Sequence, residues 1–154
     1  MAVTISPATE ADAALVHSFV CKLAEYENML HHVKASVDDL RRWLFGEWRV
    51  AEAAIARAGD RPVGCAVFFP MFSTYSGHPA IYIEDLFVDP DHRGAGVGRA
   101  LIEYLGDLGR KRGCDKLQWS VLKWNHKAIG FYERIGATIV DDWATYRLDI
   151  SEKA

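Results

Sequence analysis

Hydrophobic residues in the first part of the chain recur at the spacing of an α-helix. Four of them, separated by four, four and three residues, share one helical face: Leu15, Phe19, Leu23 and Tyr26. Thr9, with Asp12 three residues later, is a suitable N-cap before this run. A second helix is predicted to begin at residues 36–39 and to end near Gly46.

The rest of the pattern is mostly that of strands. A short strand is predicted at residues 2–5, and the Gly59-Asp60 turn favours a hairpin between residues 49–57 and 62–72. The alanines of residues 49–57 favour a helix, so this segment by itself is ambiguous. Further strands are predicted over four segments: 80–88, 116–122, 137–140 and 143–150.

Two later helices lie between these strands. One carries an apolar face and ends at Gly113, the face being Val97, Leu101, Leu105 and Leu108. Asn125 caps the other, which runs through Ile135. The predicted order is β-α-α-β-β-β-α-β-α-β-β, an α/β mixture around one sheet. The 154 residues suffice for one domain.

Composition and charge narrow the class of protein. Half of the residues are apolar and the net charge is −3, which argues against a disordered chain and against a basic field for nucleic acid. Cys21, Cys65 and Cys114 form no disulfide framework, and the histidines lack metal-ligand spacing, so no metal is expected. Because no apolar stretch reaches ~18 residues and the N-terminus does not read as a signal peptide, a cytoplasmic protein is expected.

A glycine-rich segment after the strand at 80–88 carries the candidate chemistry. Gly94, Gly96 and Gly98 alternate along it and let backbone N–H groups turn toward one point. The following helix adds its positive N-terminal end, so the segment suits a phosphate or pyrophosphate, although an ordinary tight turn also uses glycine. Because Arg99 follows Gly98, this is no Walker A loop, and a dinucleotide fingerprint would need GxGxxG directly after the first strand.

The run from Arg93 to Gly98 (RGAGVG) resembles the acetyl-CoA-binding signature of the GNAT superfamily of N-acetyltransferases. Trp124-Asn125 and residues 131–137 (FYERIGA) are similar to the family's second signature and follow at the right distance. The resemblance implies a GNAT-type α/β fold with a mixed, mostly antiparallel central sheet, flanking helices and a splayed acetyl-CoA-binding strand pair. It covers nearly the whole chain, so residues 1–154 are expected to form a single N-acetyltransferase domain.

Residues 22–29 (KLAEYENM) and 82–88 (YIEDLFV) further resemble the diamine acetyltransferases, the spermidine/spermine and thialysine group. Those enzymes acetylate a primary amine at the end of a small cationic molecule. They also carry an acidic residue shortly before the last strand, whereas this chain has Trp143-Ala144-Thr145-Tyr146 there. This departure weighs against long substrates that carry several charges.

Two residues are expected to carry the chemistry. Glu84 is the candidate general base for the amine proton, acting directly or through water. Adjacent strand residues point to opposite faces, so Glu84 and Asp85 line one site only if the strand is bulged, as the resemblance implies. Otherwise they are an exposed pair on an edge strand. Tyr132 is the candidate acid by resemblance, and without that resemblance it would be a core tyrosine of an amphipathic helix.

The resemblance also implies the binding residues. Acetyl-CoA is expected as co-substrate along three stretches: Leu86, Phe87 and Val88; Arg93, Gly94, Ala95, Gly96, Val97, Gly98 and Arg99; and Asn125, His126, Lys127 and Ala128. Asn125 is equally suited to be only an N-cap. The amine is expected to bind at Tyr26, Glu27 and Asp85. For Glu27, an ordinary position at a solvated helix end explains the residue equally well.

The expected function is therefore acetyl transfer from acetyl-CoA to a polyamine, diamine or lysine analogue by direct attack in a ternary complex. One alternative is a GNAT that acetylates a protein lysine, an N-terminus or an amino acid. The other is a non-catalytic acyl-CoA-binding module. The expected partners are the two small molecules, with no nucleic acid and no membrane. A homodimer is implied because related enzymes exchange or pair C-terminal strands.

Overall fold

The computed structural model describes residues 2–151, which fall into two compact units, the first ending at Ser120 and the second beginning at Val121. The first unit is built on one five-stranded sheet in the order β1-β2-β3-β4-β5. Its strands are β1 (Val3–Pro7), β2 (Glu52–Ala58), β3 (Arg61–Ser73), β4 (His78–Val88) and β5 (Leu117–Trp119). The first four are antiparallel neighbours and β5 is parallel to β4, so the mixed α/β fold expected from the sequence is confirmed.

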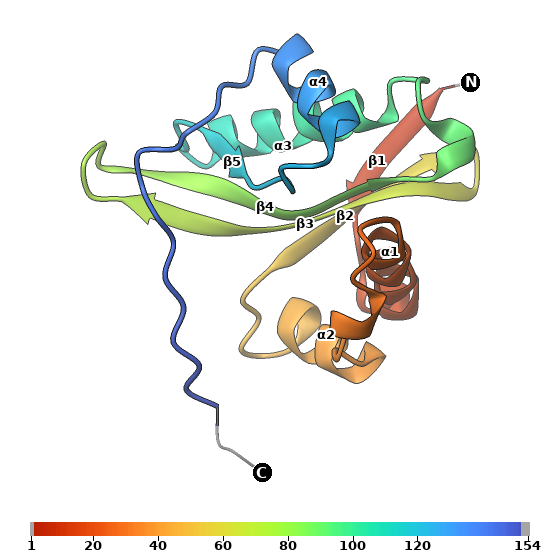
Figure 1. The fold of residues 1–154 in the computed structure, drawn as a ribbon. Coiled ribbons are helices and arrows are strands. Elements are labelled where there is room, and N and C mark those ends of the chain that lie inside the picture. Colours follow the sequence, from red (N-terminus) through yellow and green to blue (C-terminus); the bar gives the residue numbers. More distant parts are fainter. Residues whose placement is uncertain (1, 152–154) are drawn as a thin grey trace. The chain divides into compact units, whose positions relative to one another are not determined.

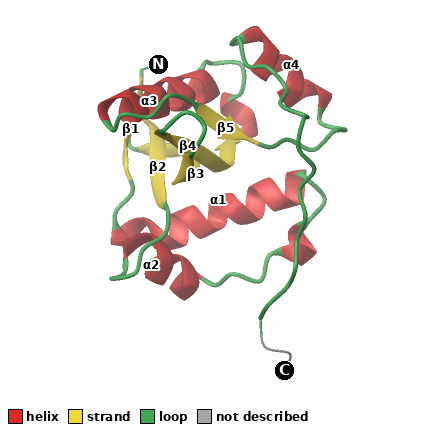
Figure 2. Cartoon of the chain, turned by 90° about the vertical axis from the view of Figure 1, so that its left-hand side faces the viewer, coloured by secondary structure: helices red, strands yellow, loops and turns green. Residues whose placement is uncertain are grey.

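Helices cover both faces of this sheet (Figures 1 and 2). On one face lie α1 (Ala13–Tyr26) and α2 (Val37–Phe45), and on the other lies α3 (Val97–Lys111). Three short 3-10 turns complete the unit: Glu10–Asp12, Leu30–His32 and Pro90–His92. Among these described residues, no helix is long and apolar enough to cross a membrane.

The alternation of the central strands produces two cores. Ala54, Ala66 and Ile81 pack beneath α3, together with Leu101 of that helix. Residues next to them along the strands, such as Ile55 and Cys65, pack beneath α1. Each central strand is therefore apolar on both faces, as a strand between two helical layers must be.

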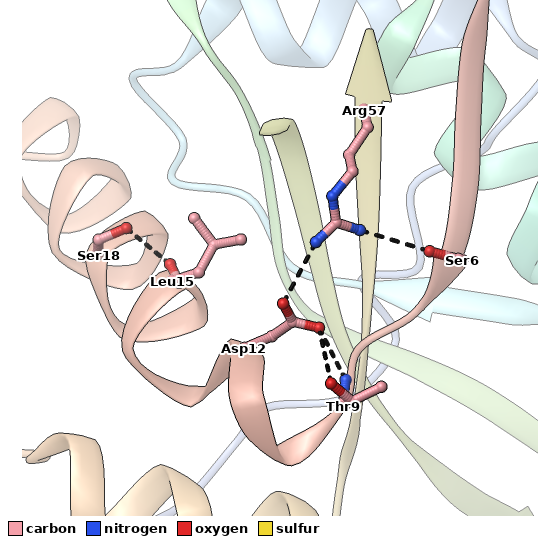
Figure 3. A network of polar contacts seen from close by, with 6 residues as sticks. All are labelled: Ser6, Thr9, Asp12, Leu15, Ser18 and Arg57. Carbon is pink, nitrogen blue, oxygen red and sulfur yellow. Dashed lines mark hydrogen bonds and ion pairs between the residues drawn. The ribbon is translucent and has the colours of Figure 1, made fainter. Parts of the chain in front are cut away.

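The start of α1 is held to the sheet by a polar network (Figure 3). The backbone N–H of Thr9 donates to Asp12 Oδ2 at 2.8 Å, which closes the turn before the helix. Arg57 on β2 then reaches Asp12 Oδ1 at 3.2 Å and the Ser6 hydroxyl at 3.5 Å. A half-buried ion pair thus fixes the first turn of α1 against β1 and β2.

The other end of α1 is closed by a Schellman motif. Asn28 adopts a left-handed conformation with φ of 58°. Its N–H donates to the Glu25 carbonyl at 3.1 Å, and the N–H of Met29 donates to the Ala24 carbonyl at 2.7 Å. This cap fixes the direction in which Tyr26 and Glu27 leave the helix.

The second unit contains α4 (His126–Arg134), which Asn125 caps as predicted by accepting a hydrogen bond from the Ala128 N–H at 3.3 Å.

The two strands predicted at 137–140 and 143–150 are wrong, because the structure assigns no strand within residues 137–151. The strand predicted at 116–122 is shortened to β5. Large apolar side chains of the C-terminal segment are exposed, among them Tyr146 at 94% and Leu148 at 85%. Their alternation is typical of a strand, but a strand also needs a neighbour for its backbone groups.

Candidate active site

The central feature of the site is a bulge in β4. Phe68 of β3 pairs with Ile83, but the next residue of β3, Val67, pairs with Asp85, so Glu84 is an extra residue. Phe68 and Ile83 belong to the core beneath α3, whereas Val67 belongs to the core beneath α1. Because paired residues share a face, Asp85 points toward the α1 side, and Glu84, next to Ile83, points there too. The bulge implied by the resemblance is confirmed.

The bulge gathers negative charge on one face. Burial, together with the charges of Glu84 and Glu27, raises the pKa of Asp85 from 3.8 to about 6. Burial also raises the pKa of Glu27, which follows the last residue of α1. The structure therefore brings together the acidic residues that the sequence proposed for base and amine binding, Glu27, Glu84 and Asp85. Of these, Glu84 is exposed and Asp85 is half-buried.

Beyond the bulge, one edge of β4 is open. β5 pairs in parallel only with Ile81, Tyr82 and Ile83. Within the described residues no strand pairs with residues 84–88 on that side, while on the other side Leu86, Phe87 and Val88 pair with β3. An open strand edge presents backbone N–H and C=O groups that can pair with an extended ligand.

The glycine-rich loop follows directly and opens α3. Gly94 and Gly96 have φ values of 81° and 84°, conformations that disfavour a side chain, and an added Cβ at either would meet no atom within 4 Å. Gly96 is the N-cap of α3 and supplies no side-chain hydrogen bond. The first N–H groups of this fifteen-residue helix, at Val97, Gly98 and Arg99, therefore remain available to an anion. The loop residues fit the phosphates of acetyl-CoA.

Gly64 brings this loop against the sheet. A Cβ at Gly64 would lie 2.9 Å from the Phe87 carbonyl oxygen and 3.3 Å from Cγ1 of Val97. Val97 is the first residue of α3 and is only 1% exposed. A side chain at position 64 would push the start of α3 away from β4, so the loop position depends on this glycine. The sequence reasoning missed Gly64, although a glycine inside an apolar strand is a signal of close approach.

Arg93, before the glycines, and Arg99, in the first turn of α3, face different surroundings. Nε of Arg93 donates to the Val88 carbonyl at 2.9 Å, and its guanidinium carbon lies 4.8 Å from the centre of the Tyr26 ring. Nε of Arg99 donates to Glu103 one turn later at 3.0 Å, and both side chains are exposed. Arg93 therefore contacts the end of α1, whereas Arg99 lies on the outer surface of α3.

The remaining candidate residues lie in the second unit. Asn125 is 8% exposed, and its side chain caps α4, whose first turn holds His126, Lys127 and Ala128. Tyr132 lies on the last full turn of α4, half-buried, with its ring 5.5 Å from that of Phe131. The N-cap role expected for Asn125 is confirmed, and the ligand roles of these residues remain predictions.

The first unit thus combines an open strand edge, a glycine-rich loop with open N–H groups at the start of α3, and a cluster of carboxylates at a bulge. This arrangement can hold an extended, phosphate-bearing acyl carrier beside a proton acceptor, which defines an acyltransferase. The profile of the Acetyltransferase (GNAT) family matches residues 21–137. The chain belongs to this family and is an N-acetyltransferase that uses acetyl-CoA to acetylate amines.

Individual relatives agree with this assignment. The chain is 33% identical to thialysine N-epsilon-acetyltransferase of Sus scrofa, over 96% of this chain and 92% of the relative. It is also 33% identical to the protein of the same name from Caenorhabditis elegans, over 96% of this chain and 90% of the relative. Among solved structures, an integron cassette protein from the mobile metagenome of V. cholerae superposes with a TM-score of 0.79 at 28% identity, covering 97% of this chain and 93% of that one.

Proposed function

We propose that this enzyme acetylates a primary amine of a small cationic molecule, such as a diamine, a polyamine or a lysine analogue, by direct attack in a ternary complex. The observation that carries the proposal is the bulge at Glu84, which turns two adjacent carboxylates toward one face, near Glu27. A concentration of negative charge attracts a cation. The relatives named thialysine N-epsilon-acetyltransferase support an amine of this size and charge.

In the proposed mechanism Glu84 accepts the amine proton. A primary amine like that of lysine has a pKa of about 10.4, so at neutral pH it arrives protonated and cannot attack. Glu84 takes the proton directly or through a water molecule, and the nitrogen lone pair then forms a bond to the thioester carbonyl carbon. The charge that develops on the carbonyl oxygen is stabilised by a backbone N–H at the bulge.

Departure of the thiolate completes the proposed reaction. The carbon–sulfur bond breaks and its electron pair stays on sulfur, while the nitrogen of the new amide releases its second proton to water. Tyr132 is the proposed donor of a hydrogen bond to that sulfur. Full proton transfer from a phenol to a thiolate is uphill on ordinary pKa values, about 10 against 8.5. Tyr132→Phe is therefore expected to lower kcat and to leave the KM for acetyl-CoA nearly unchanged, and an unchanged kcat would contradict the role of Tyr132.

An amine panel tests the proposed substrate class. Thiol release from acetyl-CoA is followed with spermidine, putrescine, lysine, thialysine, neutral amino acids and a lysine-containing peptide. The proposal expects the highest kcat/KM with a small amine that carries a second positive charge. A preference for the peptide or for neutral amino acids would favour the alternative substrate classes instead.

Paired variants test the base. Glu84→Gln removes the proposed acceptor, so kcat/KM is expected to fall at least tenfold. Asp85→Asn keeps Glu84 and is expected to change mainly the amine KM. If Asp85→Asn abolished turnover while Glu84→Gln retained the wild-type kcat/KM, Asp85 would be the base instead.

We further propose that residues 1–154 act as one N-acetyltransferase domain and that two copies form a homodimer in the cytoplasm. The family profile, which runs from residue 21 to residue 137, supports the single domain. The exposed alternating apolar residues Tyr146, Leu148 and Ile150 support a strand that is completed by a second copy. The three cysteines are free thiols, which is usual in a reducing compartment. Light scattering tests the dimer, and a monomeric mass would contradict it.

A further inference from the structure

Arg93 stands at the start of the glycine-rich loop, but its side chain turns back toward the sheet. Its Nε donates to the Val88 carbonyl, the last residue of β4, at 2.9 Å. Its guanidinium carbon lies 4.8 Å from the centre of the Tyr26 ring and 5.7 Å from that of Phe87. One planar cation thus contacts the end of α1, the end of β4 and the ring of a core residue, as a guanidinium can by stacking and donating together.

The residue that Arg93 reaches on α1 is tied to the acidic cluster. Tyr26 is the last residue of α1 and Glu27 is its C-cap, and the cap at Asn28 fixes both. Glu27 is one of the two carboxylates whose charge raises the pKa of Asp85. Because Tyr26 and Glu27 are consecutive residues held by the same cap, the backbone that positions the Tyr26 ring also positions Glu27.

The backbone of Arg93 is continuous with the proposed phosphate site. Gly94 and Gly96 hold the loop in left-handed conformations next to Arg93, and the open N–H groups of α3 come next. A phosphate that accepts hydrogen bonds from these groups fixes the loop in one conformation. Because the Arg93 side chain contacts Tyr26, fixing the loop restrains the end of α1 as well.

We infer that Arg93 is a positioning residue that couples the two substrate sites, so that occupation of the glycine-rich loop by CoA increases the affinity for the amine at the end of α1. This inference rests on the proposed function. Arg93 acts through Tyr26 and Glu27 and takes no proton itself. Linkage is reciprocal, so the amine must increase the affinity for CoA by the same factor, and couplings of this kind typically reach about 5–150-fold.

The test measures a coupling factor by calorimetry. CoA, which carries no acetyl group, is used with the panel amine of highest kcat/KM, so no reaction occurs. The amine Kd is measured with and without saturating CoA, and the ratio is the coupling factor. In the wild-type enzyme we expect a factor of at least five, and in Arg93→Gln a factor below two. Arg110→Gln, which removes an exposed arginine of α3 paired with Asp107, is the matched control and keeps the wild-type factor.

Further variants separate coupling from a merely structural role. Arg93→Lys keeps the charge but loses the planar guanidinium group that joins the Tyr26 ring to the Val88 carbonyl. Its coupling factor is therefore also expected to be below two. Tyr26→Phe keeps the ring and the coupling, whereas Tyr26→Leu loses it. Arg93→Gln in the Tyr26→Leu background is expected to change the factor no further. If Arg93→Gln does not fold, Tyr26→Leu carries the same test from the other partner.

Three results would overturn the inference: a wild-type factor near one, an unchanged factor in Arg93→Gln, or full coupling in Tyr26→Leu. Each of them is compatible with turnover of the panel amines, so each refutes the coupling alone. Absence of turnover with every amine of the panel would instead refute the proposed function, and the inference with it.

Discussion

Asp85 lies opposite Val67 in the ladder between β3 and β4, one residue later than regular pairing would place it. The extra residue, Glu84, lets two adjacent carboxylates face the same side of the sheet. On a regular strand one of them would point into the core beneath α3, where an unpaired charge is costly. The bulge therefore allows this sheet to carry two neighbouring carboxylates next to two hydrophobic cores.

This arrangement lowers the stability of the enzyme at neutral pH. Folding raises the pKa of Asp85 from 3.8 to about 6. Between these two pH values the folded protein keeps a proton on Asp85 that the unfolded chain has already released. The free energy of unfolding must then fall as the pH rises toward and through 6. Asp85→Asn is expected to be more stable than the wild type at pH 7.5, by up to about 3 kcal/mol, with the difference vanishing below pH 4. Urea unfolding at several pH values measures this.

Glu52 supplies a control, because its effect on the free energy of unfolding has the opposite pH dependence. Arg112 donates to both of its carboxylate oxygens, at 2.6 and 2.7 Å, and these hydrogen bonds lower the pKa of Glu52. Its stabilisation is therefore present at neutral pH and is lost as the pH falls through the lowered pKa. Glu52→Gln should cost about 1 kcal/mol at pH 7.5 and nothing in acid. Equal pH dependence in both variants would contradict the electrostatic interpretation.

Glu27 should set the preference for doubly charged amines. Its carboxylate is partly buried and close enough to Asp85 to raise the pKa of that group. Removing one negative charge near a second ammonium group weakens the binding free energy by about 1 kcal/mol, which lowers the affinity roughly fivefold. Glu27→Gln is expected to raise the KM of a diamine about fivefold and that of a monoamine much less. Steady-state kinetics measure this, and Glu25→Gln, on the exposed side of α1, should change neither.

Two glycines, Gly64 packed against the start of α3 and Gly106 inside α3, should respond in opposite directions to alanine. Gly64→Ala places a Cβ 2.9 Å from the Phe87 carbonyl oxygen. We expect the free energy of unfolding to fall by about 1–3 kcal/mol and the KM for acetyl-CoA to rise. Gly106→Ala, inside α3, meets only the flexible end of Arg110 at 3.6 Å and should gain up to about 1 kcal/mol. Urea unfolding of both variants compares them directly, and a loss in Gly106→Ala would contradict this account.

The cap of α1 should depend on the backbone conformation of Asn28. With φ of 58°, this position accepts glycine readily and β-branched residues poorly. Asn28→Gly is expected to match the wild-type stability, while Asn28→Val should lose about 1–2 kcal/mol. The valine variant should also raise the amine KM, because Tyr26 and Glu27 lie directly before the cap. Similar melting temperatures for the two variants would argue against the cap.

Local patterns in the sequence predicted most of the fold and part of the site. The period of apolar residues identified α1 and α3, and alternating glycines identified the loop before α3. These features depend on near neighbours in the chain. The bulge at Glu84 came only from the family resemblance, because a register shift depends on the facing strand.

Features that depend on a distant partner were missed or wrong. The C-terminal strands were predicted from alternation, which does not say whether a neighbouring strand is present. The stacking of Arg93 on Tyr26 joins residues that are far apart in sequence, so no spacing rule could find it. Gly64 and Asn28 gave weaker signals, a glycine in a strand and an asparagine after a helix, whose meaning became clear only with the distances and φ values.

The open edge of β4 also has a consequence for handling the enzyme. Exposed strand edges recruit strands from other molecules, and this edge carries Leu86 and Val88 between the bulge and the loop. A bound CoA lying along it would act as a protective cover. Preparations stripped of the nucleotide should therefore be the first to precipitate on concentration, and added CoA should keep them in solution.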